Sequence, residues 1–308
     1  MITEEMRIRN LQPPQGHFDA VLDTDAYNEI DDQFALSYLL SATDCATVKA
    51  LCAAPFLNSR SVSPEDGMVR SEAEIRKLLT LAGRDDLQSI VYAGSRTYLP
   101  DEHTPVDSPA ARAMAELSKA YSPEHPLYIV AIGAITNVAS ALLMDPTMAD
   151  RVVIVWLGGH AQHWHDTREF NMMQDVAAAR VVFGCGAPLV QLPCRGVVDR
   201  FTVSKPELEY WMIGKSPLCT YLAENTIQAA EAYASGRPWT RVIWDVTAVA
   251  WLFNKDGNLM DSRVVPAPIP EYDDHYGYDY TRHSMRYVTY IQRDALMADL
   301  FRRLGAMN

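Results

Sequence analysis

Short apolar runs alternate with longer amphipathic stretches along the first two thirds of the chain. Six runs rich in β-branched or apolar residues have the length of buried strands, and the segments between them have helical periodicity. The predicted strands are residues 18–23, 46–54, 89–94, 127–133, 151–159 and 187–193. The predicted helices lie near residues 31–42, 65–82, 107–121, 135–144 and 174–184. This alternation predicts an α/β fold with a mainly parallel central sheet flanked by helices.

After residue 200 the pattern becomes helix-rich. Amphipathic segments fill residues 204–236, and a buried helix is expected from Asp245 onward. The run MRYVTYI, residues 285–291, alternates like a strand, and RDALMADLFRRL after it is expected to form a closing helix. Only residues 266–283 are clearly irregular, and their tyrosines favour a role as the wall or lid of a binding site.

Composition and charge narrow the class of protein. Of 308 residues, 48% are hydrophobic and 21% are charged, and no segment has the composition of a linker or repeat, so we expect one domain over residues 1–308. The net charge of −12 argues against a nucleic acid or an anionic membrane as partner, because both would repel the protein. Five scattered cysteines without a CxxC pair, and an acidic N-terminus without an apolar leader, are typical of a cytoplasmic protein with reduced thiols.

Acidic residues are concentrated directly after the first predicted strand. The stretch VLDTDAYNEIDDQFAL contains Asp23, Asp25, Glu29, Asp31 and Asp32. Ligands of parallel α/β sheets bind beyond the carboxyl ends of the strands, which is where this stretch is expected to lie. Crowded carboxylates repel one another, so they must take up protons, lie near a helix N-terminus or bind a cation. A hard divalent cation with oxygen ligands would account for the whole group.

The acidic stretch is also compatible with two arrangements that need no such cation site. Asp31 could cap the helix that follows while the other carboxylates are solvated. The DxD pattern after a first strand also occurs in phosphohydrolases with an aspartate nucleophile, although those usually have Thr or Val two positions after the second Asp, where this chain has Tyr27.

Three more segments place polar groups at the end of an apolar strand or the start of a helix. They are IGAITNVASAL (132–142), GGHAQHWHDTREFNMMQD (158–175) and IWDVTAVAWL (243–252). Together with DTDAYNEIDD they resemble the calcium-dependent inosine-uridine-preferring nucleoside hydrolase family. That family has a DxDxGxDD motif after the first strand, a GxxTN turn, an EFNxxxD segment and an HD or WD pair, and the corresponding segments occur here in the same order.

The resemblance implies a Ca²⁺-dependent hydrolase that cleaves the N-glycosidic bond of ribonucleosides. Asp25 matches the carboxylate that binds calcium and accepts a proton from water. The other implied calcium ligands are Asp32, Asp245 and the backbone carbonyl of Ile132. The chemistry is consistent with these residue types, because a metal acidifies bound water and negative groups stabilise an oxocarbenium-like transition state.

The resemblance also implies contacts to the sugar. Asp31 and Asn171 match groups that hydrogen-bond the 2′- and 3′-hydroxyls, and Glu169 matches the group that holds the 5′-hydroxyl end. Asn137 is either a substrate contact or part of a capping turn at a helix start. Asp23 is expected to orient the metal loop from behind. The implied partner is a small nucleoside, and the implied assembly is a homo-oligomer, either a dimer or a tetramer.

The metal loop departs from the family pattern. Five residues, AYNEI, separate Asp25 from Asp31, two more than in the family's glycine-containing turn. If Asp31 and Asp32 still reach the ion, the loop must bulge outward; otherwise Glu29 or Asn28 would have to replace them.

The residues expected to contact the sugar and the base also differ from the family pattern. His163 occupies the place of a sugar-contacting Asn, and His160, His163 and His165 together leave a zinc site as an alternative. Trp244 replaces a His that protonates the leaving base in inosine- and pyrimidine-cleaving members. Purine-preferring relatives have Trp there, so Trp244 is expected to stack on a purine unless it is a core residue.

Three functions therefore remain open from the sequence. The first is a calcium-dependent hydrolase of purine-like ribonucleosides. The second is a hydrolase that uses the same metal site on a different ribosyl or glycosyl substrate. The third is a homologue that binds a sugar or nucleoside without turnover. On the base side, His103 is expected in a surface loop, and Asn58 replaces a family Gly-Asn only if its loop is shifted.

Overall fold

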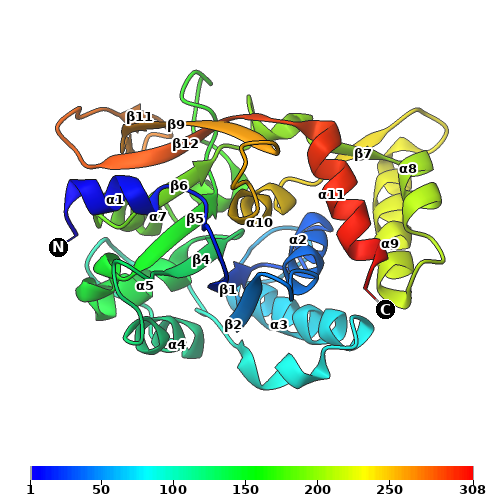
Figure 1. The fold of residues 1–308 in the computed structure, drawn as a ribbon, viewed down its shortest axis with the longest axis horizontal. Helices are drawn as coiled ribbons and strands as arrows, with labels where there is room; N and C mark the ends of the chain where they lie inside the picture. Colours follow the sequence, from blue (N-terminus) through cyan, green and yellow to red (C-terminus); the bar gives the residue numbers. More distant parts are fainter. Residues whose placement is uncertain (1, 308) are drawn as a thin grey trace.

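An eight-stranded sheet runs through the middle of the molecule, with helices on both faces (Figure 1). The computed structural model describes residues 2–307. The strands of this sheet are β1 (Phe18–Thr24), β2 (Ala46–Ala53), β3 (Val91–Tyr92), β4 (Leu127–Ala131), β5 (Val152–Leu157), β6 (Leu189–Leu192), β9 (Met260–Pro266) and β12 (Ser284–Ile291). Their order is β3-β2-β1-β4-β5-β6-β12-β9. Neighbouring strands are parallel except β9, which runs antiparallel to β12.

Helices connect most of these strands. They are α1 (Glu4–Asn10), α2 (Asp31–Leu40), α3 (Pro64–Leu81), α4 (Pro109–Ser118), α5 (Thr136–Met144), α6 (Phe170–Gln174), α7 (Val176–Gly184), α8 (Lys205–Trp211), α9 (Pro217–Ala234), α10 (Val246–Leu252) and α11 (Arg293–Gly305). Three of them, α3, α4 and α9, begin with a Ser-Pro pair. In each, the serine hydroxyl accepts a backbone N–H three residues later and proline occupies the first helical position, so the start of the helix is fixed locally.

The sheet separates two hydrophobic cores. Leu22 and Val130 belong to the core covered by α2, α3, α10 and α11, whereas their neighbours Val21 and Ile129 belong to the core covered by α4, α5 and α7. Successive side chains of a strand point to opposite faces, and both faces are covered here. The inner strands are therefore continuous apolar runs, as parallel strands in α/β proteins usually are.

The chain reverses its direction of progress across the sheet between β1 and β4. From β1 it moves outward to β2 and β3, and it then returns to the other side of β1 and continues through β4, β5 and β6. The carboxyl ends of β1 and β4 are adjacent, with Asp23 beside Ala131. Such a switch point leaves a crevice at the carboxyl ends of the strands.

The predicted α/β fold, with a single domain and a mainly parallel sheet, is confirmed. The third strand is shorter than predicted, because a 3-10 helix, η1 (Asp85–Ile90), occupies most of the polar stretch before it. Strand β9 was not predicted. It is an edge strand with exposed polar residues such as Asp261 and Arg263, so it lacks the apolar run that identifies an inner strand.

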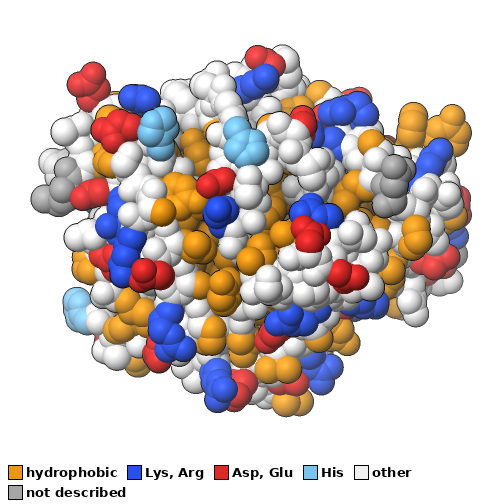
Figure 2. Space-filling model, turned by 60° about the horizontal axis from the view of Figure 1, so that its bottom comes forward, with side chains coloured by type: hydrophobic (Ala, Val, Ile, Leu, Met, Phe, Trp, Pro, Cys, Tyr) orange, Lys and Arg blue, Asp and Glu red, His pale blue; other side chains and the backbone are white. Residues whose placement is uncertain are grey.

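The remaining strands are short pairs outside the main sheet. The irregular residues 266–283 contain β10 (Ile269–Pro270) and β11 (Tyr276–Gly277), and β7 (Thr202–Ser204) pairs with β8 (Thr240–Val242). Over residues 2–307, none of the helices combines the length and the apolar character needed to cross a lipid bilayer. On the face shown in Figure 2, Lys and Arg side chains are interspersed with Asp and Glu and form no continuous basic stripe.

Candidate active site

A cavity of about 310 Å³ lies at the switch point of the sheet. Its wall is formed by the loop after β1, the start of α2, the ends of β4, β5 and β6, and the residues before α10. The sequence predicted a site at this edge, and eight of the predicted site residues line the cavity. They are Asp25, Asp31, Asp32, Ile132, Glu169, Asn171, Trp244 and Asp245.

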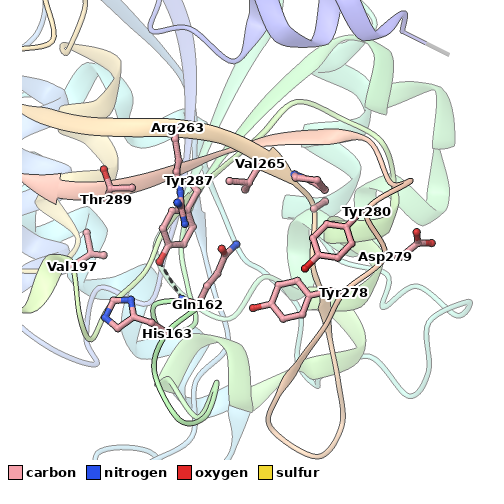
Figure 3. A pocket seen from close by; sticks show the side chains of 12 residues that line it. Gln162, His163, Val197, Arg263, Val265, Tyr278, Asp279, Tyr280, Tyr287 and Thr289 are labelled. Carbon is pink, nitrogen blue, oxygen red and sulfur yellow. Dashed lines mark hydrogen bonds between the residues drawn. The ribbon is translucent and has the colours of Figure 1, made fainter.

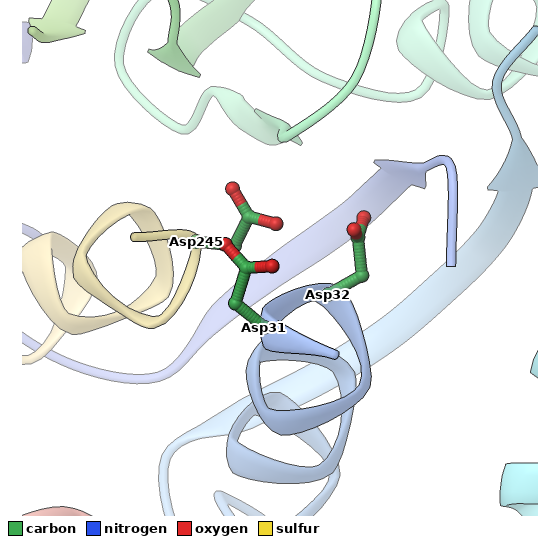
Figure 4. A group of neighbouring side chains, drawn as sticks. All are labelled: Asp31, Asp32 and Asp245. Carbon is green, nitrogen blue, oxygen red and sulfur yellow. The ribbon is translucent and has the colours of Figure 1, made fainter. Parts of the chain in front are cut away.

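Three aspartates converge in this cavity. Asp31 and Asp32 lie in the first turn of α2, and Asp245 immediately precedes α10, which packs against α2. One carboxylate oxygen from each lies within 4.8 Å of the others, and all three side chains are buried. Figure 4 shows the three carboxylates directed toward the same space between the two helices. The contact between α2 and α10 thus brings together residues more than 200 positions apart in the sequence.

Asp25 lies beside these three aspartates, and the four residues together form the acidic floor of the cavity. Asp25 is 1% exposed, and neither of its carboxylate oxygens has a hydrogen-bond partner in the described chain. Behind it, Asp23 accepts a hydrogen bond from Asn137 (Oδ1 to Nδ2, 2.8 Å), whereas its Oδ2 is buried and unpaired. Thr24 donates its hydroxyl to Asp32 (Oγ1 to Oδ1, 2.5 Å). Several buried acidic oxygens therefore lack the partners that buried polar groups normally have.

Burial raises the pKa of all four aspartates at this floor, and neighbouring negative charges raise it further in each case. For Asp25 the strongest neighbour is Asp32, for Asp31 it is Glu29, and for Asp245 it is Asp31. For Asp32, burial raises the pKa while the hydrogen bond from Thr24 lowers it. A cation among these groups would have the opposite effect, favouring the ionised forms. The donor set consists of carboxylate and carbonyl oxygens, which are the ligands of hard divalent cations.

The longer loop between Asp25 and Asp31 does not remove the aspartates from the cavity. The loop closes as a turn in which Asn28 N–H donates to Asp25 O (2.7 Å). Glu29 forms an ion pair with Arg241, and the Tyr27 ring lies near the Arg60 and Arg70 guanidinium groups. The additional residues are therefore held by contacts of their own, and neither Glu29 nor Asn28 has to replace Asp31 or Asp32.

Asn58 joins the same side of the cavity. Its Nδ2 donates to Asn28 Oδ1 (2.6 Å), and both residues line the wall. The sequence allowed this position for Asn58 only with a shifted loop, and the contact to the longer loop around Asn28 provides the reason. His103, by contrast, is exposed, as expected.

The EFN segment forms the opposite side of the cavity. Glu169 is the N-cap of α6 and accepts three backbone N–H groups: Asn171 at Oε1 (2.9 Å), and Gly159 (2.9 Å) and Met172 (3.0 Å) at Oε2. Burial raises the pKa of Glu169 to about 7 in spite of these bonds. Asn171 donates its side-chain amide to Ile132 O (3.2 Å) and Leu157 O (3.0 Å), so its orientation is fixed by the ends of β4 and β5.

Trp244 forms part of the wall beside Asp245. Its indole Nε1–H is buried and has no acceptor in the described residues, while the guanidinium of Arg241 lies 6.0 Å from the ring centroid. A buried donor without a partner is uncommon in proteins.

Asn137 does not line the cavity. Its Nδ2 donates to Asp23 Oδ1 and to Ala53 O (3.1 Å), and its Oδ1 accepts the backbone N–H of Ser95 (2.7 Å) and the Ser95 hydroxyl (2.8 Å). Its polar atoms are thus used within the protein. The structure therefore replaces the predicted substrate contact with a role in orienting Asp23.

His163 also lies elsewhere. It is exposed and lines a second cavity of about 560 Å³, together with Gln162, Tyr278 and Tyr287 (Figure 3). Gln162 N–H donates to the Tyr287 hydroxyl (3.0 Å), which holds this part of the loop against β12. The residue of the loop that reaches the acidic cavity is His160, which is 5% exposed.

The zinc alternative is not supported by the described residues. The group of side chains close enough to share a metal ion is the aspartate triad, and the three histidines of the loop are not among its members. His165 instead lies 3.1 Å from Asp166 Oδ2 through its Nε2.

Several residues of the cavity wall were not identified from the sequence. They include Arg168, Cys194 and Arg195, whereas His160 was considered only as part of a possible zinc site. A signal for each was present, since His160 and Arg195 lie just beyond the ends of β5 and β6, and Arg168 directly precedes Glu169. The carboxyl ends of β5 and β6 thus contribute to the site along with that of β1.

Comparisons with known proteins find similarity to nucleoside hydrolases. A family model described as inosine-uridine preferring nucleoside hydrolase matches residues 20–295. The pyrimidine-specific ribonucleoside hydrolase RihA of Citrobacter koseri is 25% identical over 242 residues, covering 69% of this chain and 76% of that protein. The solved structure of the plant nucleoside hydrolase PpNRh1 has a TM-score of 0.74 at 22% identity, covering 95% of this chain and 100% of that chain. A purine-preferring ribonucleoside hydrolase from Gardnerella vaginalis has a TM-score of 0.73 at 18% identity, covering 94% and 98%.

Proposed function

Because the chain belongs to the inosine-uridine preferring nucleoside hydrolase family and is a hydrolase of N-glycosyl compounds, we propose that it is a calcium-dependent enzyme that prefers purine ribonucleosides. The products would be the free base and ribose. The observation that carries this proposal is the acidic floor of the cavity. Buried carboxylates from β1, α2 and α10 meet there, and the oxygens of Asp25 have no partner in the protein.

The residues proposed to hold calcium are Asp25, Asp32, Asp245 and the carbonyl of Ile132. Asp31 belongs to the same cluster and lies close enough to share the ion or to contact the substrate beside it. The unpaired oxygens and the oxygen-only donor set fit a hard cation. When bound, such an ion supplies positive charge that acidifies and orients a water molecule.

Asp25 is proposed to accept the proton of the attacking water. Its burial among carboxylates increases its affinity for a proton, as a general base requires. The water oxygen then adds to the anomeric carbon as the bond to the base breaks. Positive charge develops on the ribose in this step, and the surrounding carboxylates stabilise it.

Asp31 and Asn171 are proposed to hold the 2′- and 3′-hydroxyls of the ribose. The amide of Asn171 is fixed by two backbone carbonyls, so its position costs little entropy when a substrate binds. Both residues line the same cavity as Asp25. This arrangement would place the anomeric carbon of the ribose beside Asp25, the proposed general base.

Trp244 supports the proposed preference for purines. Trp244 lies in the cavity wall next to Asp245, where a planar base can stack on its ring. Names among the relatives point in both directions, since the Citrobacter koseri protein is called pyrimidine-specific and the Gardnerella vaginalis protein purine-preferring.

A panel of ribonucleosides incubated with the purified chain tests the proposal. Base release would be measured by chromatography, with added Ca²⁺ and with the protein depleted of metal by a chelator. We expect inosine, adenosine and guanosine to be cleaved faster than uridine and cytidine, and all activity to disappear without metal. Activity that is equal in metal-depleted protein would reject the calcium requirement, and faster cleavage of pyrimidines would reject the base preference.

A further inference from the structure

Positively charged and hydrogen-bond-donating groups line the Glu169 side of the cavity, and the proposed reaction gives them no role. They are Arg168, Arg195 and His160. Arg168 immediately precedes Glu169, His160 follows the end of β5, and Arg195 follows the end of β6. The acidic floor and Trp244 come from other elements, namely β1, α2 and the residues before α10.

Backbone hydrogen bonds place these three groups next to one another. Cys194 N–H donates to Gly159 O (2.8 Å), and Ala161 N–H donates to Arg195 O (2.9 Å), so the segments after β5 and β6 run side by side. Gly159 N–H in turn donates to Glu169 Oε2. The two arginines are therefore tied to the same end of the cavity through Gly159 and Glu169.

Both arginines are exposed, and neither is neutralised by a buried ion pair. Within residues 2–307, Arg195 has no carboxylate oxygen within 4.0 Å, and its guanidinium lies 5.9 Å from the centroid of Trp164. Arg168 Nε is 3.5 Å from Asp274 Oδ2, and its side chain is 64% exposed, so this ion pair is weak. Arg241, on the Trp244 side, is by contrast paired with Glu29.

His160 adds a donor without a positive charge. Its Nδ1 accepts the backbone N–H of Arg195 (3.3 Å), so a neutral ring carries its proton on Nε2. Nε2 lies 3.9 Å from Asp166 Oδ1, which is too long for a hydrogen bond. His160 is 5% exposed and lines the cavity.

Glu169 has little capacity left to hold a hydroxyl group. Its two oxygens already accept three backbone N–H groups as the cap of α6. The 5′ end of the substrate would therefore meet mainly donors, namely two guanidinium groups and one imidazole N–H. A group with several acceptor oxygens and negative charge matches such a set far better than a hydroxyl does.

We propose that this end of the cavity binds a phosphate ester on the 5′ carbon, so that the enzyme prefers ribonucleoside 5′-monophosphates to unphosphorylated nucleosides. The inference rests on the proposed function, since it assumes ribose bound over the acidic floor. Water adds to the anomeric carbon, the carbon–nitrogen bond breaks, and the base leaves with a proton. The sugar product is ribose 5-phosphate.

The overall negative charge of the protein does not prevent this binding. The net charge is −12, but at physiological salt a charge more than about 8 Å away is largely screened. The distant surface carboxylates therefore contribute little, and the nearby Glu169 carboxylate is compensated in part by the three backbone N–H groups that it accepts.

Kinetic comparison of matched substrates tests the proposal. We expect kcat/KM for inosine 5′-monophosphate to exceed that for inosine by about tenfold or more, the scale of one or two charge-assisted hydrogen bonds. Arg195→Gln and Arg168→Gln should each lower this ratio by about tenfold. Arg200→Gln is the matched control, because Arg200 is exposed, lies five positions from Arg195 and does not line the cavity; it should leave the ratio unchanged.

An equilibrium measurement separates this inference from the proposed reaction. Calorimetric titration of the calcium-loaded protein should show ribose 5-phosphate binding about tenfold more tightly than ribose, with the difference lost in Arg195→Gln. Equal binding of the two sugars, together with cleavage of nucleosides but not of monophosphates, would overturn the inference and leave the proposed function intact. Tight binding of ribose 5-phosphate without base release from any substrate would support the phosphate site and reject the proposed hydrolysis.

Discussion

Asp25 shows how burial among like charges changes a single side chain. It is closed off from solvent, its pKa is raised by burial and by Asp32, and no hydrogen bond compensates either oxygen. A carboxylate placed in this way destabilises the protein unless an ion or a proton neutralises it. The proposed roles of Asp25 in binding calcium and in accepting a proton from water explain why such a carboxylate lies at the cavity floor.

Replacing Asp25 by Asn tests this role. The amide is nearly the same size but neither accepts a proton nor carries charge, so we expect kcat to fall at least about 100-fold. The metal-free variant should be as stable as the parent or more stable, since one of the repelling charges is gone. Asp19→Asn on the same strand is the control, because Asp19 bonds Tyr121 and does not line the cavity. An unchanged kcat for Asp25→Asn would remove this residue from the mechanism.

Trp244 supports a prediction about the base. Trp244→Ala should raise KM for purine substrates by about tenfold, as expected for loss of one stacking contact, and alter pyrimidine turnover little. Trp244→Phe keeps a stacking ring but lacks the N–H, so it should recover part of the loss. Steady-state kinetics on inosine and uridine would provide the comparison. Equal losses on both substrates would indicate that Trp244 only supports the wall.

The predicted site residues that converge in the cavity are attached to short rigid elements. Asp31, Asp32 and Asp245 each lie at the start of a helix, so their positions follow from where the helix begins. His163 and Asn137 were assigned to the substrate because of their motif positions, but side-chain direction in a long loop or within a helix turn depends on tertiary contacts. The hydroxyl of Tyr287 holds the loop beside His163, and Asp23 captures Asn137.

At the scale of elements, the start of α5 connects three parts of the sheet edge. Asn137 bonds Asp23 at the end of β1, the carbonyl of Ala53 at the end of β2, and Ser95 after β3. All of these groups are buried. The amide therefore fixes the relative positions of the strand ends on which the acidic floor is built.

Asn137→Ala should accordingly destabilise the protein. It would leave the Asp23 carboxylate and a backbone carbonyl buried without partners, which we expect to lower the free energy of unfolding by roughly 3 kcal/mol. Urea denaturation measures this quantity. Asn225→Ala on α9 is a suitable control, since the bond of that amide to Gln33 is long (3.4 Å) and its loss should cost well under about 1 kcal/mol. A loss no larger than the control's would contradict the role given to Asn137.

Buried elements were predicted from the sequence more accurately than elements at the edge of the sheet. Inner strands such as β4 and β5 are covered on both faces and were evident as apolar runs, and helices with a Ser-Pro start were placed within a few residues. The edge strands β3 and β9 were predicted too long or not at all. Strand β9 is held by its pairing to β12 and not by its own apolar residues, and single-sequence periodicity does not detect such pairing.

At the scale of the whole molecule, the cavity should couple stability to pH and calcium. Burial raises the pKa of Asp23 and Glu169 to about 7 and raises those of the four floor aspartates. Without metal, the folded state thus binds more protons than the unfolded state above pH 4. Its stability should fall as pH rises from about 4 through 7.

Thermal denaturation at pH 5, 6, 7 and 8 measures this coupling. The metal-free protein should have a Tm that decreases toward pH 8, and excess Ca²⁺ should raise Tm more at pH 8 than at pH 5, because protons compete with the ion for the same carboxylates. A calcium effect of the same size at both ends of the range, or a metal-free protein that is most stable at pH 8, would contradict this coupling.

The central claim is that carboxylates from β1, α2 and α10 enclose one calcium ion on the floor of the cavity. Anomalous diffraction from crystals of the protein grown with Ca²⁺ tests it most directly. We expect one strong anomalous peak within bonding distance of Asp25, Asp32, Asp245 and the carbonyl of Ile132. Well-ordered aspartates around a position with no anomalous signal would contradict it.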